Sequence, residues 1–102
     1  MAQPLAGIQV VELQAGVAVA TAGMLLRDAG ATVIKIESPL GDASRCEPGH
    51  RVWNRGKQSV ELPEQDSRID ELLANADVVI IGGSGTARPE WTPREDQILC
   101  VA

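Results

Sequence analysis

The sequence contains neither phenylalanine nor tyrosine, and it has only two tryptophans. The core therefore has to be aliphatic, and few rings are present on which unpaired bases could stack. Basic residues are also scarce, since nine lysines and arginines stand against fourteen acidic residues and give a net charge of -5. A nucleic-acid-binding protein needs a basic face to neutralise phosphates, so we expect no nucleic-acid partner.

Cysteine and histidine are nearly missing as well. Cys46 and Cys100 form no C-x-x-C motif, and with a single histidine they cannot assemble a zinc site, so no metal is expected. The apolar run Val17–Leu26 is about half of what a bilayer requires, and the N-terminus lacks the basic start of a secretory signal. We therefore expect a cytoplasmic protein with reduced thiols and no membrane partner.

Aliphatic residues replace the missing aromatics, and 44% of the chain is hydrophobic. Residues 8–13 are rich in β-branched side chains and predict a strand, and residues 31–37 predict a second one. Between them, residues 17–29 are small or unbranched, and Gly30 stands where a helix C-cap glycine belongs. A strand, a helix and a strand over about thirty residues predict a βαβ unit with parallel strands.

A loop and a short strand are predicted next. Residues 38–51 hold two prolines, two glycines and several polar residues, which favours a loop. The sequence Asn54-Arg55-Gly56-Lys57 is typical of a tight turn. The alternating pattern of residues 58–62 predicts a strand directly after that turn.

One apolar stripe with helical spacing predicts a second helix. The stripe consists of Ile69, Leu72, Leu73 and Ala76. Asp66 or Ser67 can cap its start, and residues 77–81 and 97–102 predict two further strands. Residues 1–102 therefore predict a single α/β domain with a Rossmann-like parallel sheet and flanking helices. Because it ends on an uncovered apolar strand, we expect a truncated domain.

A dinucleotide site is the first candidate, because Gly16 follows the first strand and Glu37 ends the second about 20 residues later. The residues around Gly16 lack the G-x-G-x-x-G fingerprint, in which the glycines let a pyrophosphate approach the backbone. We therefore interpret Gly16 as a turn residue and Glu37 as a solvated strand end, rather than as parts of an NAD or FAD site.

Two further segments are candidates for phosphate binding. The loop 82–85 follows an apolar strand and has free N–H groups at the carboxyl edge, but it lacks a P-loop lysine, and a simple connection is the alternative. Arg55 and Lys57 flank a turn, which allows two interpretations. Their side chains either contact a phosphate or point into water. No nucleophile elbow accompanies the serines, and His50 is interpreted as a surface residue.

Four segments form motifs in a fixed order: PLAGIQVVEL at 4–13, MLLRDAGATVIKIE at 24–37, NRGKQSVEL at 54–62 and LLANADVVI at 72–80. In this order they resemble the family III CoA-transferases, the CaiB/BaiF group, which includes formyl-CoA transferases and α-methylacyl-CoA racemases. The resemblance implies the truncated N-terminal part of the family's large domain, with CoA or acyl-CoA as its ligand. Two positions depart from the family pattern, at residues 18–20 and 81–83.

The resemblance also implies where CoA lies, namely along the carboxyl edge of the sheet. According to the resemblance, the cations that could contact the CoA phosphates are Arg45 and Arg88. The other implied contacts are Val17, Ala18, Ser38, Leu62, Gly82, Gly83 and Ser84. The family's catalytic aspartate lies beyond Ala102, so this chain alone is expected to be inactive, with no catalytic residue of its own.

The function implied is that of the N-terminal domain of an acyl-CoA transferase or racemase. The alternative is a non-catalytic binding or assembly module that kept the fold and lost the CoA site. The changed residues at 18–20 and 81–83 favour the alternative. Because the last predicted strand is apolar, we expect self-association, as in a dimer, or pairing with the remainder of a parent protein.

Overall fold

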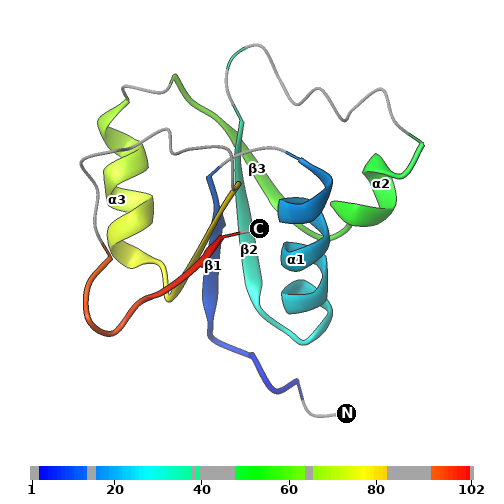
Figure 1. The fold of residues 1–102 in the computed structure, drawn as a ribbon, viewed down its shortest axis with the longest axis horizontal. Helices are drawn as coiled ribbons and strands as arrows, with labels where there is room; N and C mark the ends of the chain where they lie inside the picture. The colour runs from blue at the N-terminus through cyan, green and yellow to red at the C-terminus, as the bar shows by residue number, and fades with distance from the viewer. Residues whose placement is uncertain are drawn as a thin grey trace.

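The fold is built on one sheet of five strands, all parallel. The strands are β1 (Gln9–Glu12), β2 (Thr32–Glu37), β3 (Gln58–Glu61), β4 (Val78–Ile81) and β5 (Ile98–Val101). The helices are α1 (Val17–Asp28), α2 (His50–Trp53) and α3 (Ser67–Asn75). This computed structural model describes residues 3–13, 16–37, 39, 48–63, 66–82 and 93–101. The strand order is β3-β2-β1-β4-β5, so β1 is central (Figure 1).

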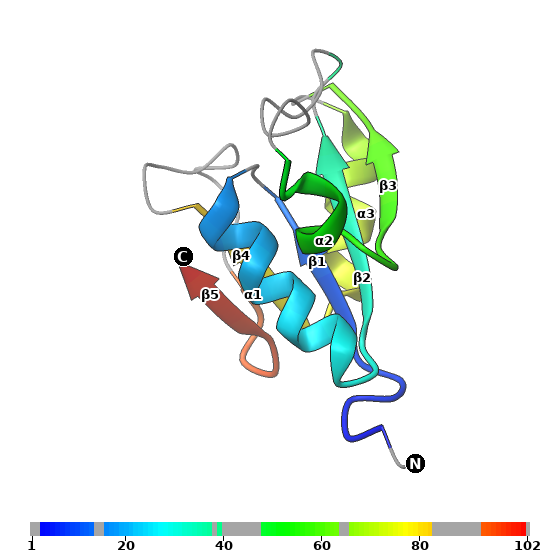
Figure 2. The same ribbon diagram turned by 90° about the vertical axis from the view of Figure 1, so that its right-hand side faces the viewer.

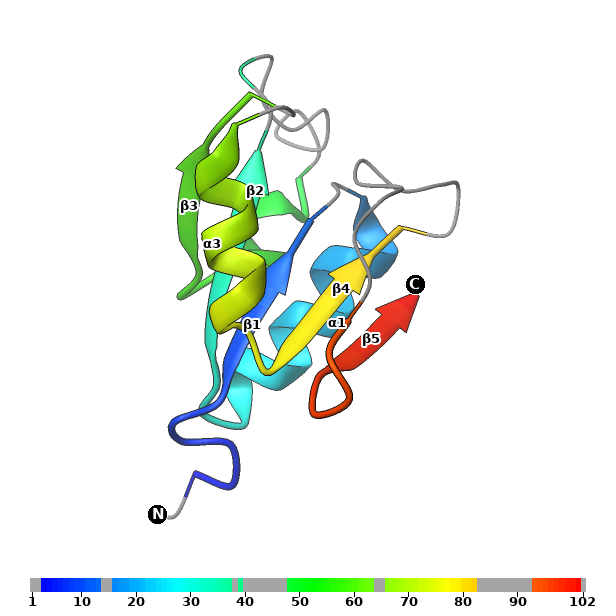
Figure 3. The same ribbon diagram turned by 90° about the vertical axis from the view of Figure 1, so that its left-hand side faces the viewer.

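Different helices cover the two faces of the sheet. α1 and α2 lie on one face and α3 lies on the other (Figure 2 and Figure 3). Successive side chains of a strand point to opposite faces, so Val10 packs with Val19 of α1 while Val11 packs with Leu73 of α3. A parallel sheet buried on both faces needs continuous apolar strands, which explains the aliphatic runs in the sequence.

The predicted α/β fold is confirmed, and each predicted strand is present with slightly shorter bounds. The loop expected over residues 38–51 is wrong at its end, because α2 begins at His50. The carbonyl of Gly49 accepts the N–H groups of Val52 and Trp53, each at 3.0 Å. The Trp53 ring occupies the space that a Cβ at Gly49 would need, and this contact closes the single helical turn.

Both ends of α3 are closed by side chains. Asp66 caps the start as predicted, since its Oδ1 accepts the backbone N–H of Arg68 at 2.9 Å. The side-chain hydrogen bond to the same carboxylate raises the pKa of Arg68. At the other end, Gln97 donates from Nε2 to the carbonyls of Leu73 and Ala76 at 2.7 and 2.8 Å. The segment before β5 is thereby fixed to the end of α3.

β5 is an edge strand of the described sheet and is paired with β4. Its apolar side chains are exposed on both faces: Ile98 by 63% and Val101 by 61% of their surface. Strands in a parallel sheet are ordinarily covered on both faces. β5 is therefore the apolar strand at which this part of the fold is least covered.

Candidate functional site

The chain changes direction across the sheet between β1 and β4. From β1 it winds outward to β2 and β3, and it then returns to the other side of β1 to form β4 and β5. Open α/β sheets bind their ligands at the carboxyl edge beside such a switch point. The candidate site is therefore the carboxyl edge at the ends of β1 and β4 (Figure 3).

Several of the predicted contact residues lie at this edge. Val17 and Ala18 follow β1 and open α1, Leu62 follows β3, and Gly82 follows β4. Val17 and Ala18 are exposed, whereas the Leu62 side chain is buried in the core against α3. Leu62 therefore offers only its main chain to a ligand. The other predicted contacts lie outside the described residues: Ser38, Arg45, Gly83, Ser84 and Arg88.

Gly16 makes the turn from β1 into α1. Its φ of 139° and ψ of 157° lie in a region that is almost restricted to glycine, which confirms its predicted part in the turn. As the N-cap residue it brings no capping side chain, and the first turn of α1 contains no acidic residue. The first N–H groups of a helix lack partners within the helix, so this end of α1 favours negative charge at the candidate site.

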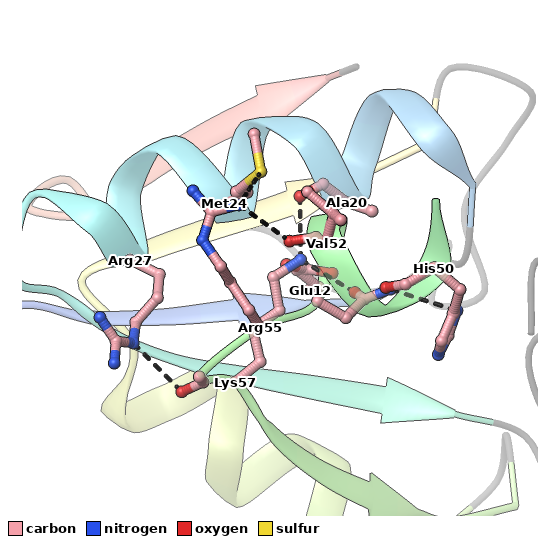
Figure 4. A network of polar contacts seen from close by, with 10 residues as sticks. Glu12, Ala20, Met24, Arg27, His50, Val52, Arg55 and Lys57 are labelled. Atoms are coloured by element: carbon pink, nitrogen blue, oxygen red, sulfur yellow. Dashed lines mark hydrogen bonds and ion pairs between the residues drawn. The ribbon is translucent and has the colours of Figure 1, made fainter. Parts of the chain in front are cut away.

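Beneath α1, a lysine and a glutamate form an ion pair closed to solvent. Lys57 Nζ lies 2.6 Å from Glu12 Oε2, and the two side chains are only 2% and 1% exposed. Lys57 also donates to the Ala20 carbonyl at 2.9 Å and to Asn54 Oδ1 at 3.0 Å (Figure 4). The expectation that Lys57 either points into water or meets a phosphate is wrong, because this network engages its ammonium group.

Gly23 makes room for the ion pair in the middle of α1. A Cβ at this position would overlap the Glu12 carboxylate and would stand 3.1 Å from Lys57 Nζ. Glycine in a helix interior costs about 1 kcal/mol relative to alanine. The close approach of the carboxylate explains why the helix nevertheless has glycine here.

A second ion pair joins the same turn to α1 on the outside. Arg55 lies 2.5 Å from Asp28 of α1, with side chains 49% and 42% exposed. The turn that carries both cations is held at Gly56, whose φ is 73° and whose carbonyl accepts a hydrogen bond from Arg27 Nε at 3.2 Å. Residues 54–57 are therefore fixed to α1 by the buried hydrogen bond from Lys57 to the Ala20 carbonyl (Figure 4) and by the exposed ion pair of Arg55 with Asp28.

Glu37 is also buried, so its interpretation as a solvated strand end is wrong. Its carboxylate accepts a hydrogen bond from the Ser59 hydroxyl, and only 6% of the residue is exposed. Lys35, on the same face of β2, is 4% exposed and is the register partner of Glu12. The α1 face of the sheet thus carries a buried layer of charge, and Glu37 is not presented to a dinucleotide ribose.

A polar pocket of about 260 Å³ lies at the opposite, amino edge of the sheet. Arg27, Thr32 and Gln58 are among its lining residues, and they stand at the end of α1 and the starts of β2 and β3. Its position separates it from the candidate site. Within the described segments there is no group of three or more His, Cys, Asp and Glu side chains that could hold a metal ion. Nor is any described helix long and apolar enough to cross a membrane.

Comparison with known proteins identifies the family. A model of CoA-transferase family III matches residues 5–98. The chain belongs to CoA-transferase family III. It is 36% identical to the succinate–glutarate CoA-transferase of Agrobacterium fabrum, over 76% of this chain and 24% of that protein. It is also 36% identical to a probable fatty acyl-CoA transferase of Mycobacterium tuberculosis, over 78% of this chain and 24% of that protein.

Solved structures of the family share the fold. The CaiB/BaiF family protein of Brucella suis superposes with a TM-score of 0.70 at 34% identity, over 80% of this chain and 26% of the other. A structure of the M. tuberculosis protein gives a TM-score of 0.73 at 30% identity, over 97% and 31% of the two chains. This family III chain therefore spans about a quarter of the length of the curated relatives it matches.

Proposed function

We propose that this chain supplies the first part of the CoA-binding edge of a family III transferase. CoA or acyl-CoA lies at the carboxyl ends of β1 and β4, along Val17, Ala18 and Gly82, and the catalytic aspartate lies outside this chain. The proposal is carried by the switch point, because the residues that follow both central strands are those that the family pattern assigns to CoA. The remaining contacts proposed are Ser38, Leu62, Gly83 and Ser84, with Arg45 and Arg88 for the phosphates.

The chemistry of the relatives supports this ligand class over the alternative of a non-catalytic assembly module. The curated relatives carry the names of transferases that act on CoA thioesters. The family match extends over residues 5–98, which includes both positions where the sequence departs from the family pattern. Those departures therefore do not remove the chain from the family.

Binding of CoA is tested by NMR titration of the chain with CoA. Backbone amide shifts are expected at residues 16–18 and 82, with a weak, millimolar dissociation constant. Ala18→Glu places a carboxylate at the exposed start of α1, where it repels the CoA phosphates. We expect the affinity to fall by about tenfold or more, the equivalent of one lost charged contact.

Ala74→Glu is the matched control, because Ala74 is an exposed residue of α3 on the other face of the sheet. This variant should bind CoA like the unmodified chain. An absence of shifts at millimolar CoA, or equal losses in the two variants, contradicts the proposed site and favours the assembly module.

Acyl-CoA incubated with a carboxylic acid acceptor and this chain should show no thioester exchange, since no nucleophilic carboxylate is assigned in this chain.

We also propose that the chain associates through β5, with a second copy or with the remainder of a parent protein. The exposed side chains Ile98 and Val101 and the unpaired edge of the described sheet favour this. Sedimentation velocity should show a concentration-dependent dimer or larger species. The double variant Ile98→Lys/Val101→Lys should shift the chain toward monomer. A monomer at all concentrations in the unmodified chain would count against association.

A further inference from the structure

The first turn of α1 packs on the sheet through the buried Val19, but it has no side-chain cap of its own. Its N-cap is Gly16, which provides no side chain, and the turn has no acidic residue. Val17 is 42% exposed, and Ala18 is exposed too. The backbone bond from Ala20 N–H to the Gly16 carbonyl, at 2.9 Å, closes the turn but does not attach it to the sheet. Because the packing of Val19 is apolar and non-directional, the orientation of this turn also depends on its polar contacts.

Lys57 attaches this turn to the sheet. Its ammonium group lies within 3.0 Å of acceptors from three segments: the end of β1, α1, and the turn before β3. Two of these contacts are hydrogen bonds, to the Ala20 carbonyl and to Asn54 Oδ1, and the third is the ion pair with Glu12. The acceptor on α1 is the carbonyl of Ala20, the residue that closes the first turn. This hydrogen bond ties the first turn of α1 to the turn before β3 and, through the ion pair, to the end of β1.

Glu12 and Gly23 complete the attachment from the other side. Glu12 is the last residue of β1, the strand that leads directly into α1. Its carboxylate fills the space that the missing Cβ of Gly23 leaves on the helix surface. The pair is therefore a spacer of fixed size between strand and helix.

The ion pair of Glu12 and Lys57 contributes more to the geometry of this region than to the free energy of unfolding. Desolvation of two charges offsets most of their attraction, and neutral side chains of similar volume are often as stable as a buried ion pair. What neutral side chains do not reproduce is a directional donor to the Ala20 carbonyl. The start of α1 would then be held by the packing of Val19 alone, and it would shift relative to the strand ends while the fold persists.

We infer that Glu12 and Lys57 are positioning residues, whose ion pair sets where the first turn of α1 stands over the carboxyl edge and so shapes the CoA site. This inference rests on the proposed function for the identity of the ligand. The attachment itself rests on the contacts within the described residues. Neither residue is exposed to a ligand, so any effect on binding has to pass through Val17 and Ala18.

The test is the neutral double variant Glu12→Met/Lys57→Met, which has no side-chain donor, compared with Asp28→Asn/Arg55→Met. The control removes the exposed ion pair between the same turn and α1. Urea unfolding, amide shifts and hydrogen exchange of residues 17–20, and CoA titration are measured on both. In the first variant we expect a cooperative transition with a midpoint near that of the unmodified chain. We also expect shifted, faster-exchanging amides at 17–20 and about tenfold weaker CoA binding, which corresponds to 1.4 kcal/mol.

The control should leave the first-turn amides and the CoA affinity unchanged. If the neutral variant folds with unaltered amides at 17–20 and unaltered CoA affinity, the inference is overturned and the pair only fills space. If the neutral variant does not fold, Glu12→Asp is used instead, because it keeps both charges and shortens the acidic side chain by one methylene. Unchanged amide shifts at residues 17–20 in Glu12→Asp then overturn the inference. Should the unmodified chain bind no CoA, the proposed function fails, while the amide measurements still decide the positioning.

Discussion

Replacing Lys57 with methionine alone is expected to destabilise the protein by about 3–5 kcal/mol, because it leaves a buried carboxylate without its cation. Glu12 is 1% exposed and cannot reach solvent without moving α1. The Ala20 carbonyl and the Asn54 amide oxygen lose the same donor. Total stabilities of single domains are about 5–15 kcal/mol, so this loss is a large fraction of the whole. Urea unfolding followed by circular dichroism measures it.

Arg55→Met is the matched control, since Arg55 bridges the same turn to α1 in an exposed pair with Asp28. Its cost should stay below about 1 kcal/mol, as for other solvent-exposed ion pairs. Adding Glu12→Gln to Lys57→Met should recover most of the lost stability, because no unpaired charge then remains buried. Equal costs for the two single variants would show that Lys57 is not part of a buried pair.

Gly23→Ala is expected to destabilise the protein by about 2–4 kcal/mol, although the same change inside most helices is stabilising by about 1 kcal/mol. The new Cβ would overlap the Glu12 carboxylate, which has to move and lose its contact with Lys57. The loss of a buried pair is larger than the gain in helix propensity, so the net sign is unfavourable.

The sign should reverse once the pair is removed. In the background Glu12→Ala/Lys57→Met, no carboxylate occupies the space next to Gly23, and Gly23→Ala should be stabilising by about 1 kcal/mol. A thermodynamic cycle of these four proteins, measured by urea unfolding, gives the coupling directly. A stabilising effect of Gly23→Ala in the unmodified background would refute the close approach.

The sequence predicts the strands and the two longer helices because their signals are local. The β-branched run of β2 and the apolar stripe of α3 each lie within a few residues, and Asp66 precedes that stripe as a cap. α2 was missed because it is a single turn. Its closure depends on the packing of the Trp53 ring on Gly49, which no periodicity over so few residues reveals.

The buried charges could not be predicted, because their partners are distant in the sequence. Glu37 ends β2 and was interpreted as solvated, yet its carboxylate accepts a hydrogen bond from Ser59 of β3. Glu12 ends β1 and forms a buried ion pair with Lys57, from the turn before β3. One signal was available: Gly23 interrupts an otherwise good helix for no local reason. A glycine of that kind marks a position where another group approaches the backbone closely.

The edge of the sheet that holds the candidate site was predictable from the sequence, but the two strands at the middle of the site were not. Val17, Ala18 and Gly82 each follow a predicted strand, so a parallel sheet brings them to one edge. The strand order decides which ends are neighbours. Only the structure places β4 beside β1 and so locates the switch point between them.

The central place of β1 also determines the order in which the chain can fold during synthesis. β1 meets β2 after residues 13–31 have been made, through a βαβ unit that covers one face with α1. The other edge of β1 stays unpaired until β4 is made, and β4 follows only after residues 13–77 have been synthesised. Until α3 and β4 arrive, Val11 and Ile36 face water on the side that α3 later covers. The nascent chain therefore carries an open apolar face and an unpaired central strand until β4 has been made, a state in which shielding by chaperones limits aggregation.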